Sequence, residues 1–89
     1  MTKEELIFYM NQGREIECYF NCVHYFIQPD FEWNKNNTGY KVNMYLCNED
    51  DEFVEKVFCG SPEDLLDVKL DMDKVLKDHW DLFVVDLIF

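Results

Sequence analysis

The chain has 89 residues, of which 48% are hydrophobic and 17% aromatic, and it carries a formal net charge of −11. The apolar content excludes a disordered acidic tail, and the length excludes a second sizeable core. We therefore expect one acidic domain over residues 1–89.

The first predicted element is a helix after Thr2. Thr2 and Glu5 have the spacing of a capping box, in which each side chain accepts a hydrogen bond from the other residue's backbone N–H. The apolar residues that follow recur at helical intervals: Leu6, Ile7 and Met10. Gly13 can adopt the left-handed conformation that often ends a helix, so we expect the helix to stop there.

Two strands joined by a tight turn are predicted next, because apolar residues alternate with others from Glu15 onward. The inward positions are Ile16, Cys18 and Phe20 in the first strand, and Val23, Tyr25 and Ile27 in the second. Asn21-Cys22 lies where a two-residue hairpin turn would be. Pro29 ends the second strand because it has no N–H to donate.

A loop is predicted over residues 30–39, which contain three asparagines and Gly39. Phe31 and Trp33 are two large apolar side chains within this loop. They either fold back over the core or extend the second strand, or else they form an exposed aromatic anchor for a partner.

Alternation over residues 40–46 predicts a third strand, and residues 53–59 predict a fourth. The acidic turn between them consists of Asn48, Glu49, Asp50, Asp51 and Glu52. It lacks the glycine and the twelfth-position glutamate of an EF-hand loop. We interpret it as a solvated hairpin tip that discourages aggregation through strand edges.

Two short helices and a last strand are predicted for the remainder. Ser61 as a cap, Pro62 at the first helical position and the acids that follow favour a helix through Leu66. Asp71 is placed to cap another helix, whose apolar face would comprise Met72, Val75, Leu76 and Trp80. Residues 83–89 predict a terminal strand that should be largely covered.

The predicted elements follow the order α-β-β-β-β-α-α-β. We expect an α+β fold in which an antiparallel β-meander of four to five strands carries three short helices on one face.

Several segments resemble small uncharacterised acidic proteins of Gram-positive bacteria and their mobile elements. They are Gln12-Gly13-Arg14-Glu15-Ile16-Glu17, His24-Tyr25-Phe26-Ile27, Gly60-Ser61-Pro62-Glu63-Asp64-Leu65-Leu66, Trp80-Asp81 and Ile88-Phe89. The resemblance spans nearly the whole chain, but it consists of caps and core patterns and implies no activity. This chain has Asn21-Cys22 where that group would have an Asn-Gly turn.

Residues that could carry catalysis are few. The cysteines have neither a CxxC pair nor a zinc-ribbon spacing, so we expect reduced thiols at Cys18, Cys22, Cys47 and Cys59. The alternatives are a metal site of Cys18, Cys22 and His24, and a Cys–His pair formed in space. We expect His79 to lie near the end of a predicted helix, where a positive charge is favourable, and His24 to lie on the surface of the hairpin. Neither histidine then needs a functional role. We therefore assign no catalytic, cofactor-binding or metal-binding residue.

Charge is distributed unevenly along the chain. Residues 1–48 carry 6 acidic and 4 basic side chains, a net charge of −2, whereas residues 49–89 carry 13 and 4, a net charge of −9. Such acidity repels nucleic-acid phosphates and attracts basic protein surfaces, or it serves solubility alone. Glu4 and Glu5 lie where a secretory signal peptide would carry basic residues. No apolar run approaches the roughly 20 residues that a membrane span needs. We expect a cytoplasmic protein without membrane or nucleic-acid contacts.

These patterns favour a small non-enzymatic interaction or regulatory module with a basic protein partner. In its sharper form this module is an acidic nucleic-acid mimic that blocks a basic groove. The alternative is a ligand-binding or catalytic domain with a site between sheet and helices. The predicted interaction surface consists of Phe31, Trp33, Glu49, Asp50, Asp51, Glu52, Asp71, Asp73 and Asp78.

Overall fold

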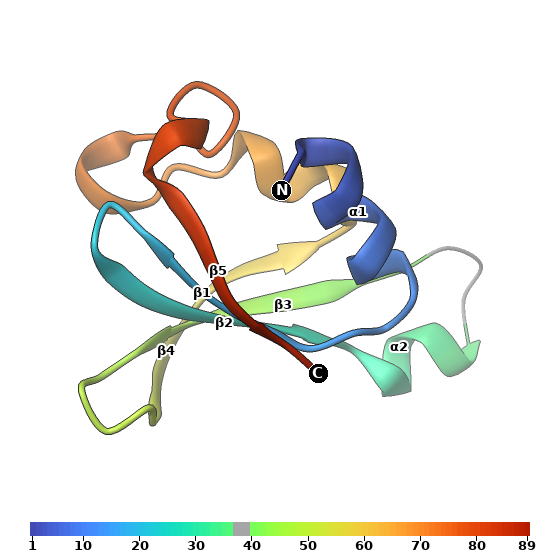
Figure 1. Ribbon diagram of the computed structural model, residues 1–89. Coiled ribbons are helices and arrows are strands. Elements are labelled where there is room, and N and C mark those ends of the chain that lie inside the picture. Colours follow the sequence, from blue (N-terminus) through green and yellow to red (C-terminus); the bar gives the residue numbers. More distant parts are fainter. Residues whose placement is uncertain (37–39) are drawn as a thin grey trace.

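The computed structural model describes residues 1–36 and 40–89 and confirms the α+β class (Figure 1). Its helices and strands are α1 (Lys3–Asn11), β1 (Ile16–Phe20), β2 (Val23–Pro29), α2 (Phe31–Asn36), β3 (Val42–Cys47), β4 (Phe53–Gly60) and β5 (Phe83–Ile88). Three short 3₁₀ helices lie between β4 and β5: η1 (Glu63–Asp67), η2 (Asp71–Asp73) and η3 (Trp80–Leu82). The number and order of the helices differ from the prediction.

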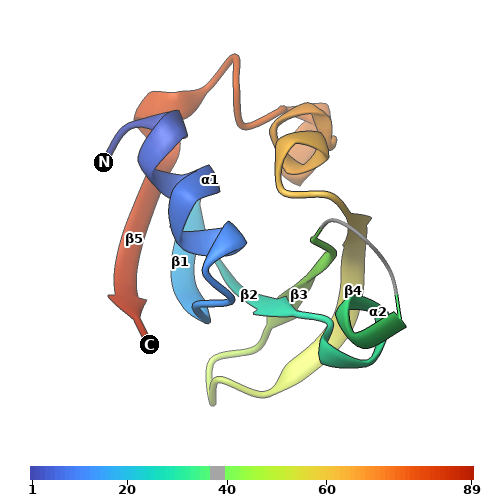
Figure 2. The same cartoon turned by 90° about the vertical axis from the view of Figure 1, so that its right-hand side faces the viewer.

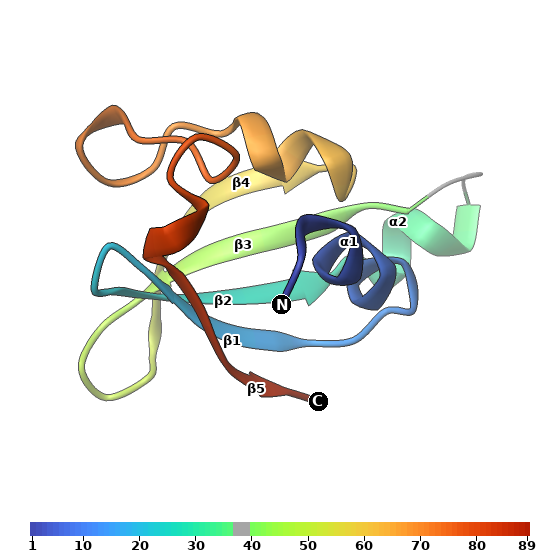
Figure 3. The same ribbon diagram turned by 45° about the horizontal axis from the view of Figure 1, so that its top comes forward.

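All five strands form one antiparallel sheet in the order β4-β3-β2-β1-β5 (Figure 3). The first four strands form the expected meander, and β5 returns to pair with β1. Cys18 lies opposite Tyr25, and Phe20 lies opposite Val23. Because opposite residues of an antiparallel pair share a face, the inward positions predicted for the first two strands lie on the same side of the sheet.

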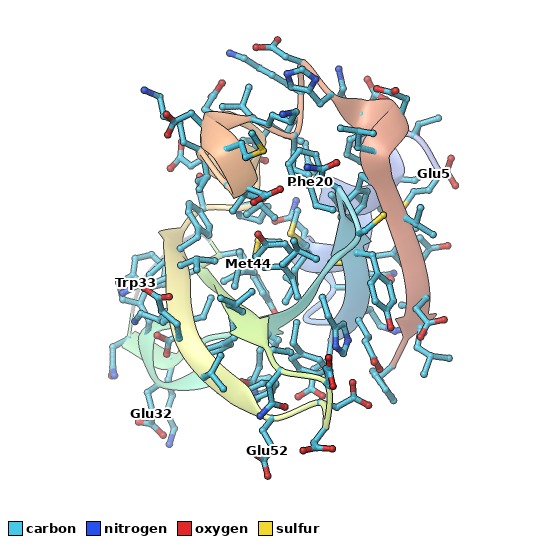
Figure 4. All side chains as sticks on the ribbon, turned by 90° about the vertical axis from the view of Figure 1, so that its left-hand side faces the viewer. Glu5, Phe20, Glu32, Trp33, Met44 and Glu52 are labelled. Atoms are coloured by element: carbon cyan, nitrogen blue, oxygen red, sulfur yellow. The ribbon has the colours of Figure 1, made fainter. Side chains whose placement is uncertain are left out.

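The core lies between this face of the sheet and a layer made of α1 and the 3₁₀ segments (Figure 2). Phe20 and Met44 point into it from the sheet (Figure 4). Its buried members are Leu6, Met10, Ile16, Cys18, Phe20, Tyr25, Ile27, Val42, Met44, Leu65 and Leu76. Burying one such side chain contributes roughly 1.5–3 kcal/mol, so this single layer supplies most of the driving force for folding.

Helix α1 begins and ends as predicted. Thr2 Oγ1 accepts a hydrogen bond from the Glu5 backbone N–H at 3.1 Å, and Glu5 Oε1 accepts one from the Thr2 N–H at 3.1 Å. Gly13 has a φ of +77°, and the Arg14 N–H donates to the Tyr9 carbonyl at 3.2 Å. This is the hydrogen bond that closes a left-handed glycine cap.

The β1–β2 turn is the predicted two-residue turn, with φ values of +50° at Asn21 and +65° at Cys22. Two consecutive positive φ angles are typical of a type I′ turn, whose twist matches that of the flanking strands. Asn21 Nδ2 also donates a hydrogen bond to Asp71 Oδ2 at 2.6 Å, so the turn is tied to η2.

The prediction of a loop at residues 30–39 is wrong for its first part, which forms α2. Asp30 Oδ1 accepts a hydrogen bond from the Trp33 N–H at 2.9 Å, so Asp30 caps this short helix. The asparagine-rich composition obscured that cap. Residues 37–39, the rest of the predicted loop, lie outside the described residues.

The helix predicted after Ser61 is instead the 3₁₀ helix η1. The Asp64 N–H donates to the Ser61 carbonyl at 3.1 Å, and the Ser61 hydroxyl lies farther from it, at 3.4 Å. Ser61 is therefore a weak cap. The chain becomes extended at Val68, which leaves too few residues to repay the cost of starting an α-helix.

The helix predicted after Asp71 is wrong. Met72 and Asp73 have φ values of +52° and +62°, and Lys69 pairs with Val75 in an isolated β-bridge. The Asp71 carboxylate accepts its hydrogen bond from Asn21 instead of capping a helix. As a result His79 does not end a helix, and it directly precedes the short η3.

The terminal strand β5 is less covered than predicted. Val84 and Leu87 are 57% and 50% exposed, because β5 is an edge strand and the helical layer covers only one face of the sheet. Within the described residues, no helix is long and apolar enough to cross a membrane.

Candidate functional site

The face of the sheet opposite α1 is lined by apolar and aromatic side chains. We call it the open face and define it by Tyr19, His24, Phe26, Tyr45, Phe53, Val84, Leu87 and Phe89. The register places these side chains together, since Tyr19 lies opposite both His24 and Val84, and Phe26 lies opposite Tyr45. Phe53 and Phe89 join the face through contacts with Phe26.

The aromatic rings of the open face contact one another across the strands. Phe26 and Phe53 have ring centroids 4.9 Å apart, and Tyr45 stacks on Phe53 at 4.9 Å. Phe89 approaches Phe26 at 6.1 Å. Aromatic pairs of this kind contribute roughly 0.5–1.5 kcal/mol each beyond the burial of their area, yet Phe53 and Phe89 are still 48% and 58% exposed. The pairs therefore leave much apolar surface in contact with water.

Carboxylates lie within and around the open face. Glu17 lies opposite Phe26, and Glu15 contacts Gln28 on the same side. Burial raises the pKa of the Tyr19 hydroxyl, and the charges of Asp86, Asp51 and Glu17 raise it further. Glu17, Asp51 and Asp86 thus lie near Tyr19, whereas Glu15 lies at the other end of β1.

His24 lies between two of these carboxylates. Its Nε2 is 2.8 Å from Glu17 Oε1 and its Nδ1 is 3.0 Å from Asp51 Oδ1. The imidazole also stacks on Tyr19, with ring centroids 4.7 Å apart. Its side chain is only 11% exposed, which corrects the prediction of a surface histidine. The acidic turn and Tyr19 cover it.

The acidic turn holds Asp51 in place. Asn48 Oδ1 accepts hydrogen bonds from the N–H groups of Asp50 at 2.9 Å and Glu52 at 3.0 Å, and Asp51 itself has a φ of +60°. Glu52 projects outward from the tip of this turn (Figure 4). The turn is therefore an ordered structure that directs one carboxylate at His24 and others at solvent.

Two open grooves flank the β1–β2 turn and share Tyr19 and Cys22. One, of about 520 Å³, is lined mainly by apolar groups that include Leu82 and Val84. The other, of about 580 Å³, includes His24, Cys47 and Asp51. A smaller groove of about 300 Å³ lies between the sheet and η2 and is bordered by Lys69 and Asp71.

All four cysteines are free, but their environments differ. Cys18 and Cys47 are buried, and burial raises the pKa of both thiols. Cys22 and Cys59 are exposed. Because the thiolate is the reactive form, the two buried groups should be inert in the folded protein.

We therefore expect two thiols to react rapidly with a thiol reagent in the native protein and four after denaturation without reductant. Replacing Cys22 and Cys59 with serine should abolish the rapid phase. Fewer than four groups after denaturation would contradict the prediction that all four thiols are reduced.

The predicted interaction residues occupy three separate places. Phe31 is exposed on α2, and Trp33 beside it is half-buried with Lys41 Nζ 5.6 Å from its ring centroid. The acidic turn adjoins the open face through Asp51. Asp71 and Asp73 belong to η2, and Asp78 lies in the turn before η3. The predicted residues therefore do not form one continuous surface, and the acidic turn is the part that contacts a residue of the open face.

The aromatic side chains of the open face were missed as functional candidates. Their signal was present at the outward positions of the predicted strands, where Tyr19, Phe26 and Tyr45 replace the polar residues usual on a solvated face. In comparisons with protein-family models, curated proteins and solved structures, nothing matches the chain. The resemblance noted from the sequence remains a prediction.

Proposed function

We propose that the protein is a non-enzymatic interaction module whose open face binds a basic protein partner. The observation that carries this proposal is an uncovered sheet face with half-exposed apolar side chains and carboxylates at its border. Contiguous exposed apolar surface rimmed by polar groups is typical of protein-binding sites.

The apolar part of the face would supply the affinity. Phe53, Leu87 and Phe89 are each about half exposed, so a partner that covers them removes further apolar surface from water. The rings of Phe53 and Phe89 already contact Phe26, so less of their side-chain entropy remains to be lost on binding. These are the properties of residues that dominate binding energy in protein interfaces.

The negative charge of the protein would determine which partners bind. Glu17 lies within the face, and Glu15, Asp51 and Asp86 lie around it. The register also places Lys56 on its β4 edge, opposite Tyr45. The whole chain carries a net charge of −11. A basic partner would therefore be steered toward this protein, whereas nucleic-acid phosphates would be repelled. A nucleic-acid enzyme with a basic groove is the sharpest form of this partner.

The test is a quantitative capture experiment with host lysate, using the chain immobilised through a tag at Met1, on the side of α1. Val84→Lys with Leu87→Lys places two cations on the open face. We expect this variant to retain the fold and to lose basic partners by at least about tenfold, because interface hot spots contribute about 2 kcal/mol or more. The readout is the amount of each captured protein measured by mass spectrometry.

A matched control is Phe8→Lys with Met72→Lys, which makes the same charge change at two exposed apolar residues away from the open face. This control should capture the same partners as the wild type. Equal capture by both lysine variants would contradict a role for the open face.

Two further variants separate the open face from general acidity. Neutralising Glu49, Asp50 and Glu52 should weaken capture, because the acidic turn borders the face. Neutralising Asp73 and Asp78 should change it little. Both effects should fade at high salt, since the screening length falls from about 8 Å at physiological ionic strength to about 3 Å at 1 M. Equal effects of the two variants would favour the whole acidic half as the binding determinant.

One observation favours the alternative, a ligand-binding domain. The groove that contains His24, Cys47 and Asp51 gathers metal-binding and nucleophilic side chains at one place. It lies at the edge of the open face, however, and not between the sheet and α1.

A further inference from the structure

We propose that Glu17, His24 and Asp51 form a binding site for a divalent transition-metal ion of the zinc class. The site is separate from the sequence expectation, which assigned no metal ligands and considered His24 only together with cysteines. It also holds whether or not a partner binds the open face.

The three residues come from different elements and converge. Glu17 lies on β1, His24 on β2 and Asp51 in the β3–β4 turn, and each offers one donor atom within 4.8 Å of the other two. Donor atoms around a tetrahedral zinc ion lie about 3.4 Å apart, given metal–ligand bonds of about 2.0–2.1 Å. The 2.8 Å separation of His24 Nε2 and Glu17 Oε1 is already near this value. Asp51 Oδ1 lies 3.0 Å from the other ring nitrogen, Nδ1, and its side chain is 68% exposed, so its carboxylate would turn toward Nε2 to complete the site.

The second observation concerns His24 itself. Its Nε2 is fully buried and makes no hydrogen bond within the described residues, although Glu17 Oε1 is only 2.8 Å away. The oxygen is thus close to the nitrogen without being placed for a directed N–H···O bond. A buried polar atom that makes no hydrogen bond is unfavourable for the folded protein. A metal ion bound by the nitrogen and the carboxylate would remove this penalty.

The donor set favours borderline transition metals over hard cations. One imidazole nitrogen and two carboxylate oxygens suit Zn²⁺ and its neighbours, whereas Ca²⁺ requires six to eight oxygens and Mg²⁺ a near-octahedral oxygen shell. The stacking of Tyr19 on the imidazole fixes the ring orientation. Three protein ligands on one side leave coordination positions open toward the groove beside Asp51.

The test is titration of the protein with zinc chloride, followed by calorimetry, in a background in which Cys22 and Cys59 are serine. We expect one Zn²⁺ per chain. Asp51→Asn and His24→Gln should each lower the affinity by at least about tenfold, since even changes outside the ligands often do so. Asp51→Asn alters an exposed turn residue, so the protein should remain folded even where His24→Gln destabilises it.

The matched control is His79→Gln, which replaces the other histidine of the chain and should bind zinc like the parent protein. Cobalt provides an independent readout, because a site of nitrogen and oxygen ligands lacks the intense charge-transfer band of cobalt–thiolate bonds. The proposal is overturned if the parent protein shows no saturable binding, if Asp51→Asn and His24→Gln bind as it does, or if the cobalt spectrum shows thiolate ligands.

Discussion

Replacing Leu76 with alanine is expected to lower the free energy of unfolding by about 2–5 kcal/mol. Leu76 is fully buried in the core, although the chain around it has little regular structure. It is the residue through which the segment between η2 and η3 contacts the core. Because small domains are stable by only about 5–15 kcal/mol, this loss is a large fraction of the total.

Met72→Ala is the matched comparison, because both residues belong to the apolar face of the helix predicted from the sequence. Met72 is 79% exposed, so its replacement should change stability by less than about 0.5 kcal/mol. Chemical denaturation of both variants measures the two values. Similar losses at the two positions would indicate that the predicted helix exists and that the 3₁₀ segments do not.

The strands were predictable from the sequence because their signal is local. Alternation at Ile16, Cys18 and Phe20 has a period of two whatever the strand pairs with, and the Asn21-Cys22 turn fixes the register of the hairpin. The helix after Asp71 failed because four apolar residues at helical spacing do not specify a helix. A contact distant in sequence, from Asn21 to Asp71, replaced the expected cap.

The candidate site was harder to predict, because its residues meet only through the sheet. His24 and Glu17 come together through the β1–β2 register, and Asp51 joins them from a turn about 30 residues along the chain. The sequence marked the acidic turn as noteworthy for its charge. It offered no means of placing one of its carboxylates against a histidine.

Replacing Gly13 with alanine is expected to destabilise the protein by more than the about 1–2 kcal/mol that a left-handed conformation costs a residue with a side chain. Gly13 has a φ of +77° at the end of α1. A Cβ atom there would also collide with the hydroxyl of Tyr40. Both α1 and the segment that leads into β3 would have to shift, which would disturb the layer above the core. The measurement is again the free energy of unfolding.

The two causes can be separated with Tyr40→Phe, which removes only the hydroxyl group. In this background Gly13→Ala should retain only the backbone part of its effect, so the double-mutant cycle should give a coupling energy between about 0.5 and 3 kcal/mol. Additive effects would mean that Tyr40 moves aside without cost. The backbone cost alone would then explain why the helix ends in glycine, because no neighbouring side chain would require the missing Cβ atom.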